Sequence, residues 1–153
     1  MLRIAVFGAG SIGCYVGGCL AAAGASVTLL GRERLLSSIQ KNGLTVTDYL
    51  GRNQHVPAAS LSLSTDPQAI SDSDLVLVTV KSAATEEAAI ALNAVLRKGV
   101  PVISFQNGIY NAEGLAHVLS SNPVLAGMVP FNVIDRGEGV FHQGSEGLLD
   151  VAE

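Results

Sequence analysis

Short apolar runs alternate with segments of helical periodicity along most of the chain, and glycine or proline stands at many of the joints. Runs this short and this rich in β-branched residues predict strands that are buried on both faces. The predicted strands are residues 2–7, 27–30, 75–80, 100–105 and 124–129. Because strands alternate with helices, the pattern predicts an α/β fold, with five or six strands in a Rossmann-type, doubly wound and mostly parallel sheet and helices on both faces.

The segments between these runs predict the helices. They are residues 12–23, 34–42, 85–96 and 111–119, together with one short turn at residues 67–70. Gly24 and Gly43 end the first two helices, and Thr85 stands where a side chain caps the third.

Three segments have weaker patterns. Residues 44–47 alternate like a short, half-exposed strand, and residues 51–65 are polar and irregular apart from a strand at 61–63. The tail at residues 140–151 alternates with glycines and predicts a hairpin-like pair of strands.

A glycine-rich loop, Gly8-Ala9-Gly10-Ser11-Ile12-Gly13, stands between the first predicted strand and the first helix. The G-x-G-x-x-G pattern alone is weak evidence, but this is the position in which a dinucleotide site needs it. Gly8 permits the tight turn, Gly10 lets the backbone approach a pyrophosphate, and Gly13 lets the helix pack closely on the strand. The free amides and the positive end of the helix, from Ser11 to Gly13, would then face the phosphates.

The residues at the end of the second strand indicate which dinucleotide is bound. NAD-binding proteins usually place an acidic residue there to accept from the ribose 2′-hydroxyl, whereas this chain has Gly31-Arg32. A guanidinium binds a 2′-phosphate through several donors, so we expect NADP(H) rather than NAD(H). Glu33 is also about twenty residues from the loop, but we expect it to point to solvent or to pair with Arg34. The alternative for Arg32 is an ordinary solvated loop arginine.

Composition narrows the class of protein. The chain has 153 residues, of which 48% are hydrophobic and only 14% charged, and its net charge is −4. This length suits one domain with a sizeable core, and the acidic balance excludes a nucleic-acid partner. So few charged residues indicate that part of the exterior meets another domain or subunit, and a homo-oligomer is one such arrangement.

No membrane partner and no metal are predicted. The chain begins with a strand rather than a secretory signal, and no apolar run approaches the length of a membrane span, so we expect a cytoplasmic protein. Cys14 and Cys19 are five residues apart on one helix, which places them on different faces as free thiols. His55, His117 and His142 have no neighbours at metal-ligand spacing.

Two polar residues follow predicted strands at the edge where such sheets bind ligands. Lys81 ends the run at 75–80, so its ammonium group could reach a ribose hydroxyl or a substrate carboxylate over the crevice. Asn107 follows the strand at 100–105. Each has a simpler alternative, because Lys81 could only solvate a loop and Asn107-Gly108 is a common turn pair.

Four motifs together resemble the ketopantoate reductase (2-dehydropantoate 2-reductase) family. In chain order they are the loop from Gly8 to Gly13, Gly31-Arg32, the run from Asp74 to Lys81, and Gln106-Asn107-Gly108-Ile109. The resemblance implies an NADP-binding domain of an enzyme that reduces the 2-keto group of ketopantoate to give pantoate for pantothenate synthesis. It also implies that the glycine loop holds the pyrophosphate and Arg32 the 2′-phosphate. Lys81 and Asn107 would lie near the nicotinamide ribose, and Asn107 would also touch the substrate.

The resemblance covers essentially all 153 residues. In this family a helical second domain supplies the proton-donating lysine and most substrate contacts, so residues 1–153 are expected to be the NADP-binding domain alone, with no catalytic residue and no turnover. Residues 128–133 depart from the small residues that are common in the family. Phe131 and Pro130 are therefore expected to reshape the nicotinamide side of the crevice for a related 2-keto acid, or to repack neutrally beneath the cofactor.

Two other functions remain open. One is another dehydrogenase of this fold, of the opine, 6-phosphogluconate or glycerol-3-phosphate type. The other is a nucleotide-sensing module without chemistry, like the regulatory domains of potassium transport systems. The Gln106-Asn107 segment and Lys81 favour the reductase over the first, and Arg32 speaks against the second, which favours an acidic residue there.

Overall fold

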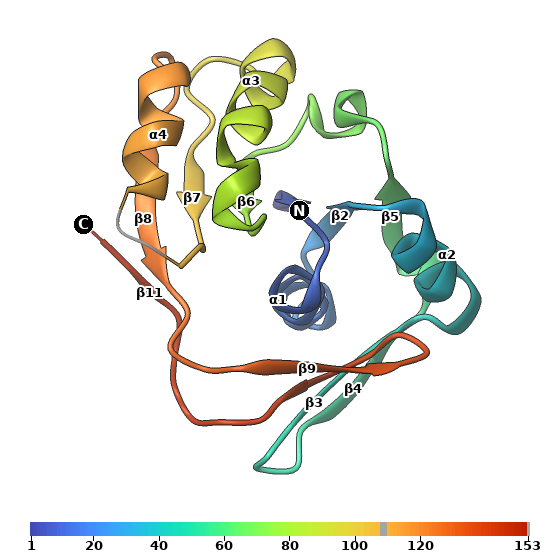
Figure 1. Ribbon diagram of the computed structural model, residues 1–153. Helices are drawn as coiled ribbons and strands as arrows, with labels where there is room; N and C mark the ends of the chain where they lie inside the picture. The colour runs from blue at the N-terminus through green and yellow to red at the C-terminus, as the bar shows by residue number, and fades with distance from the viewer. Residues whose placement is uncertain (108–109, 153) are drawn as a thin grey trace.

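The computed structural model describes residues 1–107 and 110–152. Within these residues a mostly parallel sheet of seven strands has the order β11-β8-β7-β6-β1-β2-β5 (Figure 1). The strands are β1 (Arg3–Phe7), β2 (Ser26–Leu30), β5 (Leu61–Ser64), β6 (Leu75–Val78), β7 (Val102–Ser104), β8 (Val124–Met128) and β11 (Asp150–Val151). The predicted α/β fold is confirmed. The sheet exceeds the expected five or six strands because β11 pairs with the edge of β8, antiparallel to it.

Helices pack on both faces of this sheet, as the apolar strands predict. The helices are α1 (Ser11–Ala22), α2 (Glu33–Asn42), α3 (Thr85–Val95) and α4 (Asn111–Val118). Successive side chains of a strand point to opposite faces. In β1, Ile4 and Val6 therefore join the apolar cluster around α1 and α2, whereas Ala5 joins the cluster around α3 and α4.

A second sheet of four strands, in the order β4-β3-β10-β9, covers the side of α1 that faces away from the main sheet (Figure 1). Its strands are β3 (Leu44–Asp48), β4 (Asn53–Val56), β9 (Val133–Gly137) and β10 (Val140–Gln143). Glycines let both sheets approach α1. A Cβ at Gly17 would lie 2.8 Å from Leu29 Cδ2 in the main sheet, and one at Gly18 would lie 2.6 Å from Val46 Cγ1 in the second.

The predicted hairpin within residues 140–151 is wrong. β10 pairs antiparallel with β9 and parallel with β3, whereas β11 joins the main sheet. Phe141 explains the pairing, because its side chain is buried and anchors β10 in the core around α1. Residues 51–65, which were expected to be irregular apart from a strand at 61–63, also contain β4. Only Val56 of that strand is buried, so β4 has no alternating apolar pattern.

Three short 3₁₀ turns complete the fold: η1 (Ala58–Ser60), η2 (Pro67–Ile70) and η3 (Ser82–Ala84). The turn predicted at residues 67–70 is confirmed, and the Asp66 carboxylate accepts from the Gln68 amide at its start (3.0 Å). Among the described residues, no helix is both long and apolar enough to cross a membrane. The same residues contain no group of three or more His, Cys, Asp or Glu side chains placed to hold a metal ion.

The packing of α1 between two sheets gives a testable prediction. Gly18→Leu should lower the free energy of unfolding by about 1–3 kcal/mol, because the new side chain must displace Val46 and Leu44 of β3. Ala22→Leu adds a leucine of the same size at an exposed position of the same helix and should change stability little. Urea unfolding of both variants measures the difference, and equal stabilities would contradict this packing.

Candidate functional site

The glycine loop after β1 has the backbone that its sequence predicts. Gly8 has a φ of +110°, and a Cβ there would lie 2.7 Å from the Val80 nitrogen, so only glycine fits. A Cβ at Gly13 would lie 2.5 Å from the Gly8 carbonyl oxygen and 2.6 Å from Thr79 Oγ1. The Leu30 carbonyl accepts from the amides of Gly8 (3.0 Å) and Ala9 (2.9 Å). The loop is therefore held between the carboxyl ends of β2 and β6, the strands on either side of β1.

Thr79, which is not one of the site residues predicted from the sequence, also holds this loop. Its hydroxyl donates to the Gly8 carbonyl oxygen over 2.6 Å, and its amide donates to the Phe7 carbonyl over 3.0 Å. The available signal was a threonine in the predicted strand at residues 75–80, which is otherwise apolar, since a hydroxyl that is partly removed from water needs a partner.

The start of α1 is open to an anionic ligand. The amides in the first turn of a helix have no acceptor within the helix, and here the first internal bond runs from the Cys14 amide to Gly10. Gly10 is the N-cap residue and offers no side chain to satisfy those amides. A Cβ on Gly10 would meet no atom within 4 Å. The residues present thus fit a pyrophosphate, whose oxygens would accept from the amides of Ser11, Ile12 and Gly13.

Arg32 lies beside this loop at the end of β2. It is the exposed N-cap residue of α2, and a Cβ on the preceding Gly31 would lie 2.8 Å from Ala9 Cβ. Among the described residues its guanidinium forms no ion pair, so its donors are available. Glu33 is exposed, as expected, and its carboxylate accepts from Ser37 Oγ (3.0 Å) rather than pairing with Arg34.

Lys81 and Asn107 are exposed residues on neighbouring loops at the same edge of the sheet. Lys81 is the N-cap residue of the turn η3, and the hydroxyl of the next residue, Ser82, donates to the Asn107 carbonyl oxygen over 3.0 Å. Asn107 borders a pocket of about 300 Å³ at the ends of β7 and β8, together with Ser104, Gln106 and Met128. Gly108 and Ile109, which belong to the same sequence motif, lie outside the described residues.

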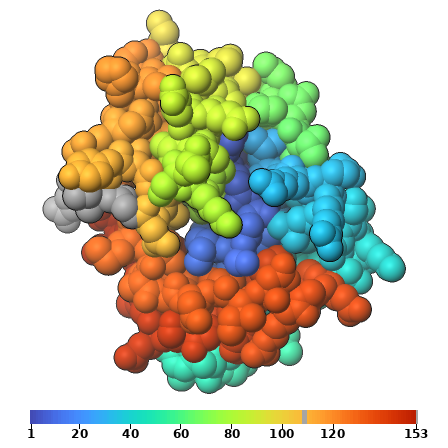
Figure 2. All heavy atoms as spheres, in the orientation of Figure 1, coloured from blue at the N-terminus to red at the C-terminus, as the bar shows by residue number. Residues whose placement is uncertain are grey.

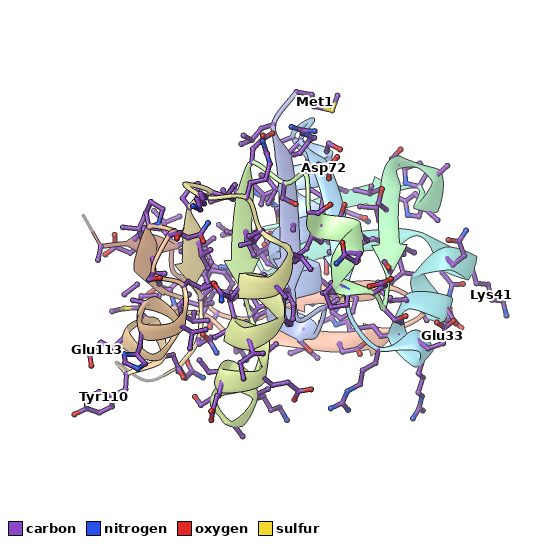
Figure 3. All side chains as sticks on the ribbon, turned by 90° about the horizontal axis from the view of Figure 1, so that it is seen from above. Met1, Glu33, Lys41, Asp72, Tyr110 and Glu113 are labelled. Carbon is purple, nitrogen blue, oxygen red and sulfur yellow. The ribbon has the colours of Figure 1, made fainter. Side chains whose placement is uncertain are left out.

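The loops and helix starts gather at one edge of the sheet. In Figure 3, Glu33 at the start of α2 and Tyr110 just before α4 lie toward one end of the strands, and Met1 and Asp72 lie at the opposite end. In Figure 2, the blue N-terminal segment reaches the surface at the centre of the molecule. The start of α2, the yellow-green segment around α3 and the orange C-terminal strands surround it.

The predicted cap at Thr85 is wrong. Ala84 is the N-cap residue of α3, and the buried Thr85 hydroxyl donates to Asn111 Oδ1 over 2.9 Å instead. The same hydroxyl accepts from Gln106 Nε2 over 2.8 Å. These side-chain partners occupy the hydroxyl that a capping bond would need.

Of the two expectations for Phe131, the structure favours repacking in the core over reshaping of the crevice. Only 8% of it is exposed, and its ring packs edge-on against Tyr15 with 5.7 Å between the ring centres. It anchors the chain between β8 and β9 in the core around α1. Met128 and Val129 line the pocket beside Asn107 instead. Phe131, after β8, is thus turned inward, whereas Met128 at the end of β8 is exposed.

A larger, more open hollow of about 490 Å³ lies between α2 and the end of β5. This hollow is not lined by the glycine loop, Arg32, Lys81 or Asn107. The larger hollow and the predicted site residues therefore lie at different places on the surface. We assign the candidate site to the glycine loop and its neighbours, because a dinucleotide is bound by backbone amides and polar side chains and not by the size of a hollow alone.

The groups with shifted pKa values do not line the pocket beside Asn107. Burial raises the pKa of the Cys14 thiol to about 12, and it also raises the pKa values of Cys19 and Tyr15. A hydrogen bond from the Arg3 guanidinium lowers the pKa of Asp74, at the start of β6. These shifts arise from the core and from an ion pair, so they do not indicate an acid or base for catalysis.

Comparisons with known proteins agree with this geometry. A family model described as ketopantoate reductase PanE/ApbA matches residues 4–153. The chain is 36% identical over 147 residues to a 2-dehydropantoate 2-reductase of Halobacterium salinarum. The aligned region covers 95% of this chain and 47% of that protein.

Solved structures are similar over nearly the whole chain. The crystal structure of a PanE/ApbA family ketopantoate reductase from Ralstonia eutropha gives a TM-score of 0.88 at 36% identity, over 98% of this chain and 49% of that one. Octopine dehydrogenase in complex with NADH and agmatine gives a TM-score of 0.83 at 18% identity, over 99% of this chain and 41% of that one, and shows the shared fold alone. The chain spans about half the length of the curated relatives it matches.

Proposed function

Because this chain belongs to the ketopantoate reductase family, we propose that it is the NADP-binding domain of an NADPH-dependent 2-keto acid reductase. In the proposed reaction, the enzyme reduces ketopantoate (2-dehydropantoate) to pantoate for pantothenate synthesis in the cytoplasm. Its support is the 36% identity to a relative named 2-dehydropantoate 2-reductase. A bound nicotinamide would supply the hydride, and the residues of this chain would hold and orient it.

The observation that carries the proposal is the open cradle at the start of α1. The amides of its first turn have no acceptor within the helix, and a Cβ on Gly10 would meet nothing within 4 Å. Gly8, Ala9 and Gly13 keep the loop compact against β1 and β2. A pyrophosphate is the ligand that such a set of amides recognises.

Arg32 supports NADP(H) over NAD(H) as the cofactor. Its exposed guanidinium, which forms no ion pair with the residues that the structure describes, stands at the end of β2, where an acidic residue would otherwise accept from a ribose 2′-hydroxyl. A guanidinium suits a 2′-phosphate because it offers several charge-assisted donors. We assign Arg32 to that phosphate, Lys81 and Asn107 to the nicotinamide ribose, and Asn107 also to the substrate.

A second domain of a longer protein is proposed to complete the enzyme. The chain spans about half the length of its relatives, and no proton donor is assigned within it. Met128 of β8, which lines the pocket beside Asn107, is an apolar side chain that is 62% exposed. We therefore expect the chain alone to bind the cofactor without turnover, because reduction of a ketone needs a proton donor as well as a hydride.

Calorimetric titration of this chain with NADPH and, separately, with NADH tests the proposal. NADPH should bind at least about tenfold more tightly, a difference of roughly 1.4 kcal/mol that one charge-assisted contact can supply. Tighter binding of NADH would contradict the cofactor assignment. Preference for ATP over both would favour a nucleotide-sensing module instead.

A further inference from the structure

One hydrogen-bond network joins the two loops that carry Lys81 and Asn107. It consists of the side chains of Ser82, Thr85, Ser104, Gln106 and Asn111 and of two loop carbonyls. Thr85, Ser104 and Asn111 are buried. Because buried polar groups need partners, the network constrains the geometry of both loops.

Gln106 holds the loop that follows β6. Its Nε2 donates to the Val80 carbonyl oxygen over 3.0 Å and to Thr85 Oγ1 over 2.8 Å. Its Oε1 accepts from Ser104 Oγ over 2.7 Å. A carbonyl oxygen can only accept, so the bond to Val80 allows one orientation of the Gln106 amide. The residue before Lys81 is thereby tied to the end of β7.

Asn111 and Ser82 hold the loop that follows β7. Asn111 Nδ2 donates to the Asn107 carbonyl oxygen over 2.5 Å and to Ser82 Oγ over 3.0 Å. The Ser82 hydroxyl donates to the same carbonyl over 3.0 Å. Since Val80 and Ser82 flank Lys81, both neighbours of Lys81 are bonded into the network, and Asn107 is bonded through its own backbone.

Thr85 connects these two halves. Its hydroxyl accepts from Gln106 Nε2 and donates to Asn111 Oδ1 over 2.9 Å. Without this hydroxyl, one amide hydrogen and one amide oxygen lose a partner in the same buried place. We propose that Thr85, acting through Gln106 and Asn111, is a positioning residue that sets the separation of Lys81 and Asn107 at the nicotinamide ribose. This inference rests on the proposed function.

Two ligands separate a positioning role from a general loss of structure. NADPH reaches Lys81 and Asn107 in the proposed mode, whereas adenosine 2′,5′-bisphosphate has no nicotinamide ribose and should contact only Arg32 and the glycine loop. Thr85→Val should weaken NADPH binding about tenfold and change the affinity for the bisphosphate by less than about twofold. Thr85→Ser keeps the hydroxyl and should restore NADPH binding.

The matched control is Thr47→Val in the second sheet. It makes the same chemical change and removes the hydrogen bond between Thr47 Oγ1 and His142 Nδ1 (2.8 Å). This bond joins two strands of the second sheet, whereas both loops follow strands of the main sheet. It should bind both ligands like the wild type. Should Thr85→Val fail to fold, Ser82→Ala tests the same network from an exposed position. It should weaken NADPH binding about threefold and leave the bisphosphate unchanged.

The outcomes distinguish the inference from the proposed function. Equal weakening of both ligands by Thr85→Val, or no recovery in Thr85→Ser, would show a merely structural role. Unchanged NADPH binding in Thr85→Val, with normal binding by the wild type, would overturn the inference and leave the proposed function standing. Failure of the wild type to bind either ligand would overturn the proposed function and the inference with it.

Discussion

Gly10→Val is expected to abolish most NADPH binding while the protein still folds. Gly10 has an extended backbone (φ −96°, ψ −159°) that valine adopts readily, and the added Cβ meets no protein atom within 4 Å. Loss of the N-cap glycine should cost at most about 1 kcal/mol of stability. The open space that accepts the side chain is the space that the pyrophosphate must enter.

The expected loss in affinity is large because the amides bind a charged group. Losing two charge-assisted hydrogen bonds at the low end of their range costs about 3 kcal/mol, roughly a hundredfold in Kd. Calorimetry with NADPH and urea unfolding together measure both effects. Gly13→Ala provides the contrast, because its Cβ would lie 2.5 Å from the Gly8 carbonyl oxygen and should reduce stability as well as binding. Wild-type affinity in Gly10→Val would place the phosphates elsewhere.

Arg32→Ala is expected to weaken NADPH binding about tenfold to a hundredfold and to leave NADH binding unchanged. The loss corresponds to roughly 1.5–3 kcal/mol for charge-assisted hydrogen bonds to the 2′-phosphate, which NADH lacks. The fold should tolerate the change, because the Arg32 side chain is exposed and makes no capping bond to α2.

Arg34→Ala is the matched control for this variant. Arg34 is an exposed arginine two residues further along, in the first turn of α2, so its removal changes the net charge equally. A specific contact with the 2′-phosphate predicts that only Arg32→Ala discriminates between NADPH and NADH. Similar losses in both variants, which disappear at high salt, would indicate general electrostatic attraction instead.

The main sheet and the glycine loop could be predicted because their signals are local. Each buried strand carries its own apolar run, and the loop, the helix start and Arg32 all lie within the first 32 residues. Gly8 and Gly13 occupy positions where the backbone geometry or a close contact excludes any other residue. The sequence therefore contained the physical reason for these features as well as their pattern.

The sequence alone thus determined the α/β order of elements, the glycine loop and the arginine beside it, since neighbouring residues specify each of them. Only the tertiary structure decided the rest. β10 pairs with β3 across about a hundred residues because Phe141 must be buried against α1, and no local pattern records that partner. The Thr85 hydroxyl suits a helix cap equally well by sequence. It bonds Gln106 and Asn111 because folding brings those residues together and removes all three from water.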